Sequence, residues 1–293
     1  GQGAQAVGMG KDATPEGVKL YEVASEILGY DLREKCLEGP KEDLDSTAIA
    51  QPAMFVTSMA ALEKLRAEDE DFEEATCAMG LSLGEYSALC YAGALTFEDG
   101  VKLTKLRGEA MQAAADARKG SMVSVIGLPK ETVMELCAKA SEECGGEPIT
   151  IANYLCNGNY AVSGSAAACD VVEKIAKPDF KARMAVRLAV AGAFHTDFME
   201  PAVDALSKAL AETDLKAPRI PVVSNVDATP HSDPDVIKDI LAKQVTSPVL
   251  FEDSVQRVLD NGFERGFELG SGKVIAGIFK RFDKQADVTP VPV

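Results

Sequence analysis

The sequence has no tryptophan and only two histidines, His195 and His231, among its 293 residues. It contains neither an H-E-x-x-H motif nor a Cys/His cluster, so a zinc site is not expected. The seven cysteines form no C-x-x-C pair and no regular framework, which favours free thiols in a reducing compartment. We therefore expect neither a metal ion nor another cofactor.

Long hydrophobic runs and positive charge are also scarce. No apolar run approaches the roughly 20 residues that span a bilayer, and a signal-peptide pattern is missing, so we expect a soluble protein. The 30 Lys and Arg residues stand against 46 Asp and Glu residues, which gives a formal net charge of -16. This balance argues against nucleic acid and anionic membrane surfaces as partners. An anionic substrate would need a local basic patch.

The most informative stretch that is present is a nucleophile elbow. Gly80, Ser82 and Gly84 form the pattern G-x-S-x-G, in which a serine lies on a sharp turn between a strand and a helix. The apolar run 75–79 predicts the strand, and helical spacing of apolar residues begins at Leu83. We predict that Ser82 is a covalent nucleophile. Because so short a pattern also occurs by chance, its context must support this role.

Two further residues are candidates for the same site. His231 lies in a turn-like, polar segment, which leaves His195 as the imidazole base for Ser82. Arg107 lies among apolar residues of a predicted helix, where a guanidinium needs a carboxylate partner. That partner is either a substrate or a structural acidic residue.

The pattern of elements predicts an α/β protein with two parts. The stretch 120–190 reads as strand 121–128, helix 130–144, strands 149–155 and 159–164, helix 166–177 and strand 181–190, the order of a ferredoxin-like subdomain. We expect it to be inserted into a larger catalytic domain of residues 1–119 and 191–293. The larger domain is predicted to carry a parallel sheet with strands at 75–79 and 220–226, and helices at 15–39, 51–66, 97–118, 235–244, 249–261 and 274–282.

Two loops complete the prediction. The first ten residues contain four glycines and read as a loop that offers N–H groups to an oxyanion. Such a loop usually follows a strand, so we expect further residues upstream, which would include any targeting sequence. The acidic run 68–74 is expected to form a surface loop.

Eight short motifs in order resemble the malonyl-CoA:acyl carrier protein transacylases, acyltransferases of fatty-acid and polyketide synthesis with an α/β-hydrolase-like larger domain. The matching motifs are G-Q-G-A-Q at 1–5, Q-P-A at 51–53, G-L-S-L-G-E-Y at 80–86, R-G at 107–108, A-N at 152–153, G-A-F-H at 192–195, S-N-V at 224–226 and Q-V-T-S-P-V at 244–249. Leu81 departs from the commonest form of the elbow, in which histidine precedes the nucleophile.

The resemblance implies a ping-pong transfer of a malonyl group through an ester on Ser82, with His195 as base. It implies that the backbone carbonyl of Gln244 orients the imidazole and that the backbone N–H groups of Gln2 and Leu83 form the oxyanion hole. Arg107 would bind the malonyl carboxylate. Substrate contacts are expected from Asn153, Phe194 and Met111.

The implied partners are malonyl-CoA and acyl carrier protein, with the chain itself a monomer. A basic rim is expected to receive the phosphates of coenzyme A and the acidic carrier, formed by Lys181, Arg183, Arg187, Lys273, Lys280 and Arg281. The acidic composition and Leu81 favour a plastid (chloroplast) or mitochondrion, with a bacterial cytoplasm as the alternative. Two other functions use the same pattern: a serine hydrolase or thioesterase, and a non-catalytic module that binds carrier protein.

Overall fold

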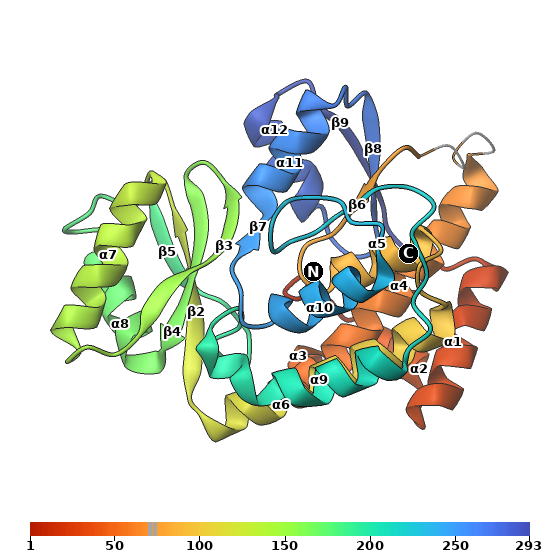
Figure 1. Cartoon of the computed structure of the whole chain (residues 1–293), viewed down its shortest axis with the longest axis horizontal. Coiled ribbons are helices and arrows are strands. Elements are labelled where there is room, and N and C mark those ends of the chain that lie inside the picture. Colours follow the sequence, from red (N-terminus) through yellow and green to blue (C-terminus); the bar gives the residue numbers. More distant parts are fainter. Residues whose placement is uncertain (70–71, 73–74) are drawn as a thin grey trace.

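The computed structural model describes residues 1–69, 72 and 75–293 and has an α/β fold. Residues 70, 71, 73 and 74 of the predicted acidic loop lie outside this description. Figure 1 shows a larger part rich in helices and a smaller part built on one sheet. None of the helices in the described ranges is both long enough and apolar enough to cross a membrane.

The larger part is built around helix α4 (Thr47–Glu68), which is buried along most of its length. Helix α1 (Pro15–Leu28) and helix α6 (Phe97–Ala117) pack against it. Its neighbour α6 approaches closely because Gly108 has no side chain: a Cβ there would lie 2.6 Å from the carbonyl oxygen of Thr47. The other helices of this part are α2 (Leu32–Glu38), α3 (Lys41–Asp45), α5 (Gly84–Tyr91), α9 (Glu200–Glu212), α10 (Pro234–Gln244), α11 (Phe251–Asp260) and α12 (Val274–Phe282).

The predicted start of the central helix was wrong. Pro52 lies inside α4, five residues after its first residue, Thr47. Proline normally begins a helix because it lacks a backbone donor. Here the packing of α4 between α1 and α6 supports the helix through that position, since tertiary contacts contribute more to helix stability than local preference does.

The strands of the larger part are parallel but short. Strand β1 (Ala78–Met79) pairs with β6 (Val222–Val223), and β8 (Arg265–Leu269) pairs with β9 (Asp287–Val291). The described residues thus place two separate two-stranded sheets in this part, where one parallel sheet was expected. The predicted strand 220–226 shrinks to two residues, and the helix predicted at 249–261 begins instead with strand β7 (Val249–Leu250).

The smaller part contains a five-stranded mixed sheet in the order β5-β2-β4-β3-β7. Its strands are β2 (Gly120–Ile126), β3 (Ile149–Cys156), β4 (Asn159–Ser165), β5 (Met184–Arg187) and β7. Helices α7 (Lys130–Glu143) and α8 (Ala166–Ile175) lie together beside it (Figure 1) and pack on its strands. Alternating apolar residues of the strands, such as Val123 and Val125, form a core with these helices that is separate from the core around α4.

Strand β7 joins the two parts. It follows α10 in the chain but pairs in parallel with β3, with Asn153 opposite Val249. The neighbouring pairs, β2 with β4, β2 with β5 and β3 with β4, are all antiparallel. The sheet of the smaller part therefore includes one strand from outside the range 120–190.

Candidate active site

The elbow has the backbone geometry that a nucleophilic serine needs. Ser82 lies between β1 and α5 with a φ angle of 53°, in the left-handed region that non-glycine residues rarely adopt. A Cβ on Gly80 would come within 2.0 Å of the carbonyl carbon of Gly84, so the turn closes only with glycine at position 80. At Gly84 a Cβ would meet nothing within 4 Å. The two glycines of the motif thus have different reasons to be present.

The structure brings Ser82 and His195 together although 113 residues separate them. The Oγ atom of Ser82 lies 2.9 Å from Nε2 of His195, and Nδ1 lies 2.9 Å from the backbone carbonyl oxygen of Gln244. A carbonyl can only accept a hydrogen bond, so Nδ1 carries the proton of the neutral ring and Nε2 is left as the acceptor. Nε2 can therefore take the proton of the Ser82 hydroxyl.

The environment of His195 keeps the imidazole neutral. Burial, together with the positive charge of Arg107, lowers the pKa of His195 from 6.5 to about 4. The bonds to the backbone at Gln244 and Ser247 oppose this shift but are weaker influences. At neutral pH the ring is thus an unprotonated base.

Arg107 reaches the same point from helix α6. Its side chain is 1% exposed, and Nη2 donates to Ser82 Oγ at 3.1 Å and to Gln244 Oε1 at 2.8 Å. Nη1 donates to Oε1 of Gln51 at 2.7 Å. All three acceptors are neutral, and of the five N–H groups of the guanidinium the buried Nε–H has no acceptor among the described residues. Burial lowers the pKa of Arg107, although Tyr86 and Glu85 oppose that shift.

A buried polar network supports these groups. The side-chain amide of Gln244, which is fully buried, donates from Nε2 to Glu85 Oε2 at 2.7 Å and to the backbone carbonyl of Ser82 at 3.2 Å. Glu85 Oε2 also accepts from the backbone N–H of Asn225 at 3.0 Å. The Asn225 side chain accepts from the Ser82 N–H at 2.6 Å and donates to the Gly80 carbonyl at 2.8 Å. Asn225 thus holds both ends of the elbow turn.

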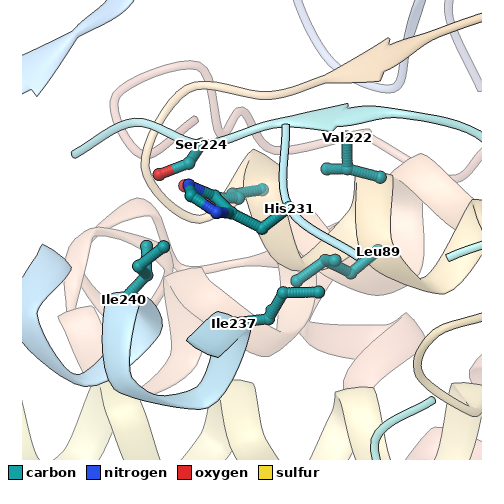
Figure 2. Close-up of a pocket in the computed structure, with 7 residues that line it drawn as sticks. Leu89, Val222, Ser224, His231, Ile237 and Ile240 are labelled. Atoms are coloured by element: carbon teal, nitrogen blue, oxygen red, sulfur yellow. The ribbon is translucent and has the colours of Figure 1, made fainter. Parts of the chain in front are cut away.

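Glu85 is an unusual member of this network because it is a carboxylic acid that is 3% exposed. Burial raises its pKa from 4.5 to about 7, and the hydrogen bonds from Asn225 and Gln244 limit the rise. It also borders a cavity of about 10 Å³, the size of about one water molecule. Figure 2 shows that the His231 side chain lies near Ser224 in this cavity, with Leu89, Ile237 and Ile240 around it.

The two residues predicted for an oxyanion hole belong to the elbow and to the N-terminal loop. Leu83 follows Ser82 directly, and the N-terminal loop packs on the elbow, since a Cβ on Gly1 would lie 2.7 Å from the Leu81 carbonyl oxygen. The Gln2 side chain donates to Thr47 Oγ1 at 3.2 Å. Within residues 1–69, 72 and 75–293, the backbone N–H groups of Gln2 and Leu83 have no acceptor. Both donors are thus available.

The three residues predicted to contact the substrate are all buried and have different partners. Met111 accepts from Gln51 Nε2 at 3.3 Å and is thereby linked to Arg107. Phe194, next to the base, is 4% exposed and its carbonyl accepts from Ser163 Oγ. Asn153 lies on β3 opposite Val249, and its buried Oδ1 has no hydrogen-bond partner among the described residues. These placements do not by themselves assign a role in substrate binding.

Comparison with known proteins identifies the family. A family model described as an acyl transferase domain matches residues 1–289. The chain belongs to the acyltransferase family. A human protein named malonyl-CoA-acyl carrier protein transacylase, mitochondrial, is 40% identical to this acyltransferase over 98% of the chain and 76% of the relative. A Bacillus subtilis protein with the corresponding name is 37% identical over 97% of the chain and 89% of the relative.

Solved structures agree with the fold of this acyltransferase. The malonyl CoA-acyl carrier protein transacylase of Coxiella burnetii superposes with a TM-score of 0.93 at 33% identity, covering 99% of the chain and 91% of that structure. A second, described as a type II PKS acyl-carrier protein in complex with its malonyl-transacylase, has a TM-score of 0.92 at 32% identity and covers 99% and 93%. The α/β architecture predicted from the sequence is confirmed at this level.

Three site residues of this acyltransferase were missed as site residues by the sequence reading: Gln51, Glu85 and Asn225. Each lay inside a motif used for the resemblance, but none has a side chain typical of a nucleophile or base. The available signal was a polar residue next to buried apolar ones, as at Gln51 beside Pro52 and Ala53. A buried polar side chain needs a partner, so such a residue predicts a network even where it does not predict a reaction.

Among the described residues, no group of three or more His, Cys, Asp or Glu side chains is arranged to hold a metal ion. The second histidine lies apart from Ser82, and its Nε2 is 2.8 Å from Asp227 Oδ2. His231 is half-buried, because it packs at the cavity beside α10.

Proposed function

We propose that the chain transfers a malonyl group from malonyl-CoA to the phosphopantetheine thiol of acyl carrier protein, for fatty-acid synthesis. The observation that carries this proposal is the position of Arg107, whose buried guanidinium lies 3.1 Å from the Ser82 hydroxyl. An acyl group on Ser82 with a free carboxylate would pair with Arg107, whereas an acetyl group would leave that cation without an anionic partner. The names of the relatives support the same substrate.

The geometry supports a two-step transfer. In the first step Ser82 Oγ attacks the thioester carbonyl carbon while its proton passes to His195 Nε2, 2.9 Å away. The carbonyl oxygen becomes an oxyanion beside the Gln2 and Leu83 N–H groups. The carbon–sulfur bond then breaks, the coenzyme A thiol leaves with the proton from His195, and a malonyl ester remains on Ser82.

The second step reverses the first with a different thiol. The carrier's phosphopantetheine thiol loses its proton to His195 and attacks the ester, and Ser82 leaves as the proton returns to Oγ. In this proposal the Gln244 carbonyl keeps the imidazole in one tautomer throughout. Phe194 limits the space beside the acyl group, while Met111 and Asn153 contact the substrate.

A mass measurement tests the proposal. Incubation with malonyl-CoA should leave a malonyl ester on the peptide that contains Ser82, and adding carrier protein should move the malonyl group to the carrier. The Ser82→Ala variant should show no adduct. Hydrolysis that outruns transfer would favour a thioesterase, and absence of an adduct on the folded wild-type chain would favour a carrier-binding module.

We further propose the finer division of the fold. The strand order β5-β2-β4-β3 and its antiparallel pairing support a ferredoxin-like subdomain over 120–190, and the separate core of that range supports an inserted unit. The elbow between β1 and α5 supports an α/β-hydrolase-like larger domain of residues 1–119 and 191–293.

Carrier protein is the proposed partner, docked on basic side chains. Lys181, Arg183, Lys273, Lys280 and Arg281 are exposed, which supports their place in the proposed rim. Arg187 does not fit it as well, because it is paired with Glu173 and Asp170 on α8. We propose a monomer that works in a mitochondrion, a plastid or a bacterial cytoplasm; the relatives include a human protein named as mitochondrial and a protein of Bacillus subtilis.

A further inference from the structure

The oxygen and the nitrogen of the Gln244 side-chain amide bond to different partners. Its oxygen accepts from Arg107 Nη2 at 2.8 Å, and its nitrogen donates to Glu85 Oε2 at 2.7 Å. The same residue's backbone carbonyl orients His195. Gln244 is thus placed between the cation that faces the acyl group and a buried carboxyl group on the opposite side.

Only one orientation of this amide satisfies its neighbours. A guanidinium has donors and no acceptor, so the amide must present its oxygen to Arg107. If the amide were rotated by half a turn, its N–H₂ group would face the guanidinium and its oxygen would face the Glu85 oxygen. The contact with Arg107 would be repulsive, and so would the contact with Glu85 when its carboxyl group is ionised. The acceptors at Glu85 and at the Ser82 backbone carbonyl, 3.2 Å from Nε2, therefore decide together with Arg107 which way the amide points.

We infer that Glu85 is a positioning residue that fixes the Gln244 amide and, through it, holds the Arg107 guanidinium in place for the acyl carboxylate. This inference rests on the proposed function. Glu85 is suited to the role because its own side chain is fixed in position. It lies in the first turn of α5, is 3% exposed and accepts a hydrogen bond from the backbone N–H of Asn225. Glu85 acts on Arg107 indirectly, since its own hydrogen bonds go to Gln244 and Asn225.

A single carboxyl oxygen makes both bonds. Oε2 accepts from Gln244 and from Asn225, while the other oxygen is left without a bond to the described residues. Glutamine at position 85 can place its carbonyl oxygen where Oε2 lies and its N–H₂ group where Oε1 lies, beside the cavity that residue 85 lines. Glu85→Gln therefore keeps the acceptor and removes only the charge.

The ratio of malonyl transfer to acetyl transfer tests the inference, because only the malonyl group has a carboxylate for Arg107. Glu85→Met removes the acceptor with a side chain of similar length. We expect kcat/KM for malonyl-CoA to fall about tenfold more than kcat/KM for acetyl-CoA, the size expected for one hydrogen bond to a charged group. Glu85→Gln should keep the wild-type ratio within about threefold.

Two further variants show whether Glu85 acts through the amide. Gln244→Met keeps the backbone carbonyl but removes the amide contacts with Arg107, Glu85 and the Ser82 carbonyl, and should lower the malonyl-to-acetyl ratio at least as much as Glu85→Met. The double variant should show the ratio of Gln244→Met alone, because the second change has no amide left to affect. If Glu85→Met fails to fold, an unchanged ratio in Gln244→Met still overturns the inference.

Several results would overturn the inference: equal losses for both substrates in Glu85→Met, a ratio in Glu85→Gln as low as in Glu85→Met, or an unchanged ratio in Gln244→Met. Failure of the proposed function looks different. In that case the wild-type chain itself would show no preference for malonyl-CoA over acetyl-CoA, before any substitution at position 85.

Discussion

At the scale of single residues, the site depends on a charge held away from water by neutral groups. Arg107 is bonded to two glutamine oxygens and a serine hydroxyl, so no carboxylate of the described residues takes part in the hydrogen bonds of its guanidinium. Burying an arginine in this way is costly, since its charge is only partly compensated. A bound carboxylate would supply the missing opposite charge, which explains how a buried cation can select a substrate.

Replacing this arginine should change selectivity more than it changes the reaction itself. We expect Arg107→Ala to lower kcat/KM for malonyl-CoA by about 100-fold or more, because the acyl carboxylate would be buried without a partner. Acetyl transfer should fall little or rise. Arg107→Lys keeps the charge but lacks the planar guanidinium, so its kcat/KM for malonyl-CoA should lie between those of the wild type and of Arg107→Ala. Equal losses for both thioesters would contradict selection by Arg107.

The fall in kcat/KM on the acid side of the pH profile should occur at unusually low pH. An imidazole with its ordinary pKa of 6.5 would be protonated below that pH, but His195 stays neutral down to about pH 4. We therefore expect that protonation of His195 causes no fall in kcat/KM near pH 6.5. The Glu85→Gln variant is the suitable background, because it removes the other group that titrates in this range. A limb centred near 6.5 in that variant would contradict the neutral, buried base.

The same two groups should shift stability with pH in opposite directions. Glu85 holds its proton up to about pH 7 in the folded chain but only to about 4.5 when unfolded, so its contribution to stability is lost as pH rises from 4.5 through 7. The lowered pKa of His195 has the opposite sign, and its contribution is lost as pH falls from 6.5 through 4. In denaturant unfolding, Glu85→Gln should therefore gain stability relative to wild type between pH 5 and about pH 8. A constant difference would contradict the raised pKa.

At the scale of elements, the elbow is a contact between two backbones. The turn at Gly80 brings β1 so close to the start of α5 that a methyl group on Gly80 would overlap the Gly84 backbone. The amide of Asn225, which lies just beyond β6, then bonds to both sides of the turn. The position of Ser82 is thus determined by the joint between elements rather than by its own preference.

The two motif glycines offer a matched pair of variants. Gly80→Ala should destabilise the fold by about 3 kcal/mol, because the backbone must move to relieve a 2.0 Å contact, and it should abolish activity. Gly84→Ala should leave stability unchanged or raise it, since the position is in a helix and open. Thermal unfolding of both variants checks this. Similar effects at the two positions would show that the elbow does not depend on this contact.

At the scale of the whole molecule, a net charge of -16 opposes the approach of an acidic carrier. Binding must then rely on local positive charge, whose effect is screened within about 10 Å at ordinary salt. The exposed side chains of Lys181 and Arg183, at the entry to β5, belong to the proposed rim.

Reversing these charges should weaken carrier binding. The double variant Lys181→Glu and Arg183→Glu should lower carrier affinity at low salt by about tenfold, with a smaller effect at high salt. Lys19→Glu with Lys208→Glu is the control, because it changes the net charge equally at exposed positions on α1 and α9. Calorimetry or fluorescence anisotropy with carrier protein measures both. Equal weakening in the two double variants would indicate a general charge effect and contradict the rim.

The sequence predicted the parts of the molecule that depend on local pattern. The helix predicted at 97–118 is observed at Phe97–Ala117, and the six elements expected between 121 and 190 all occur. Local pattern was less informative where pairing decides the structure. Val249 and Leu250 form a strand only because β3 lies beside them, and no periodicity within 249–261 contains that fact.

The site could be predicted in part for a similar reason. Ser82, His195 and Arg107 were candidates because of the chemistry of their own side chains, and the resemblance supplied the rest of the predicted positions. Glu85 could not be placed in the same way, because a glutamate in the first turn of a helix usually lies on the surface. Its burial follows from the approach of Asn225 and Gln244, which are 140 and 159 residues further along the chain.

Strand β7 has a consequence for how the two parts move. The polypeptide passes between them four times, and three of these passages have a reactive-site residue on the chain beside them: α6 with Arg107 runs into β2, β5 leads to His195, and Gln244 precedes β7. A hinge rotation of the smaller part would therefore pull on all three at once.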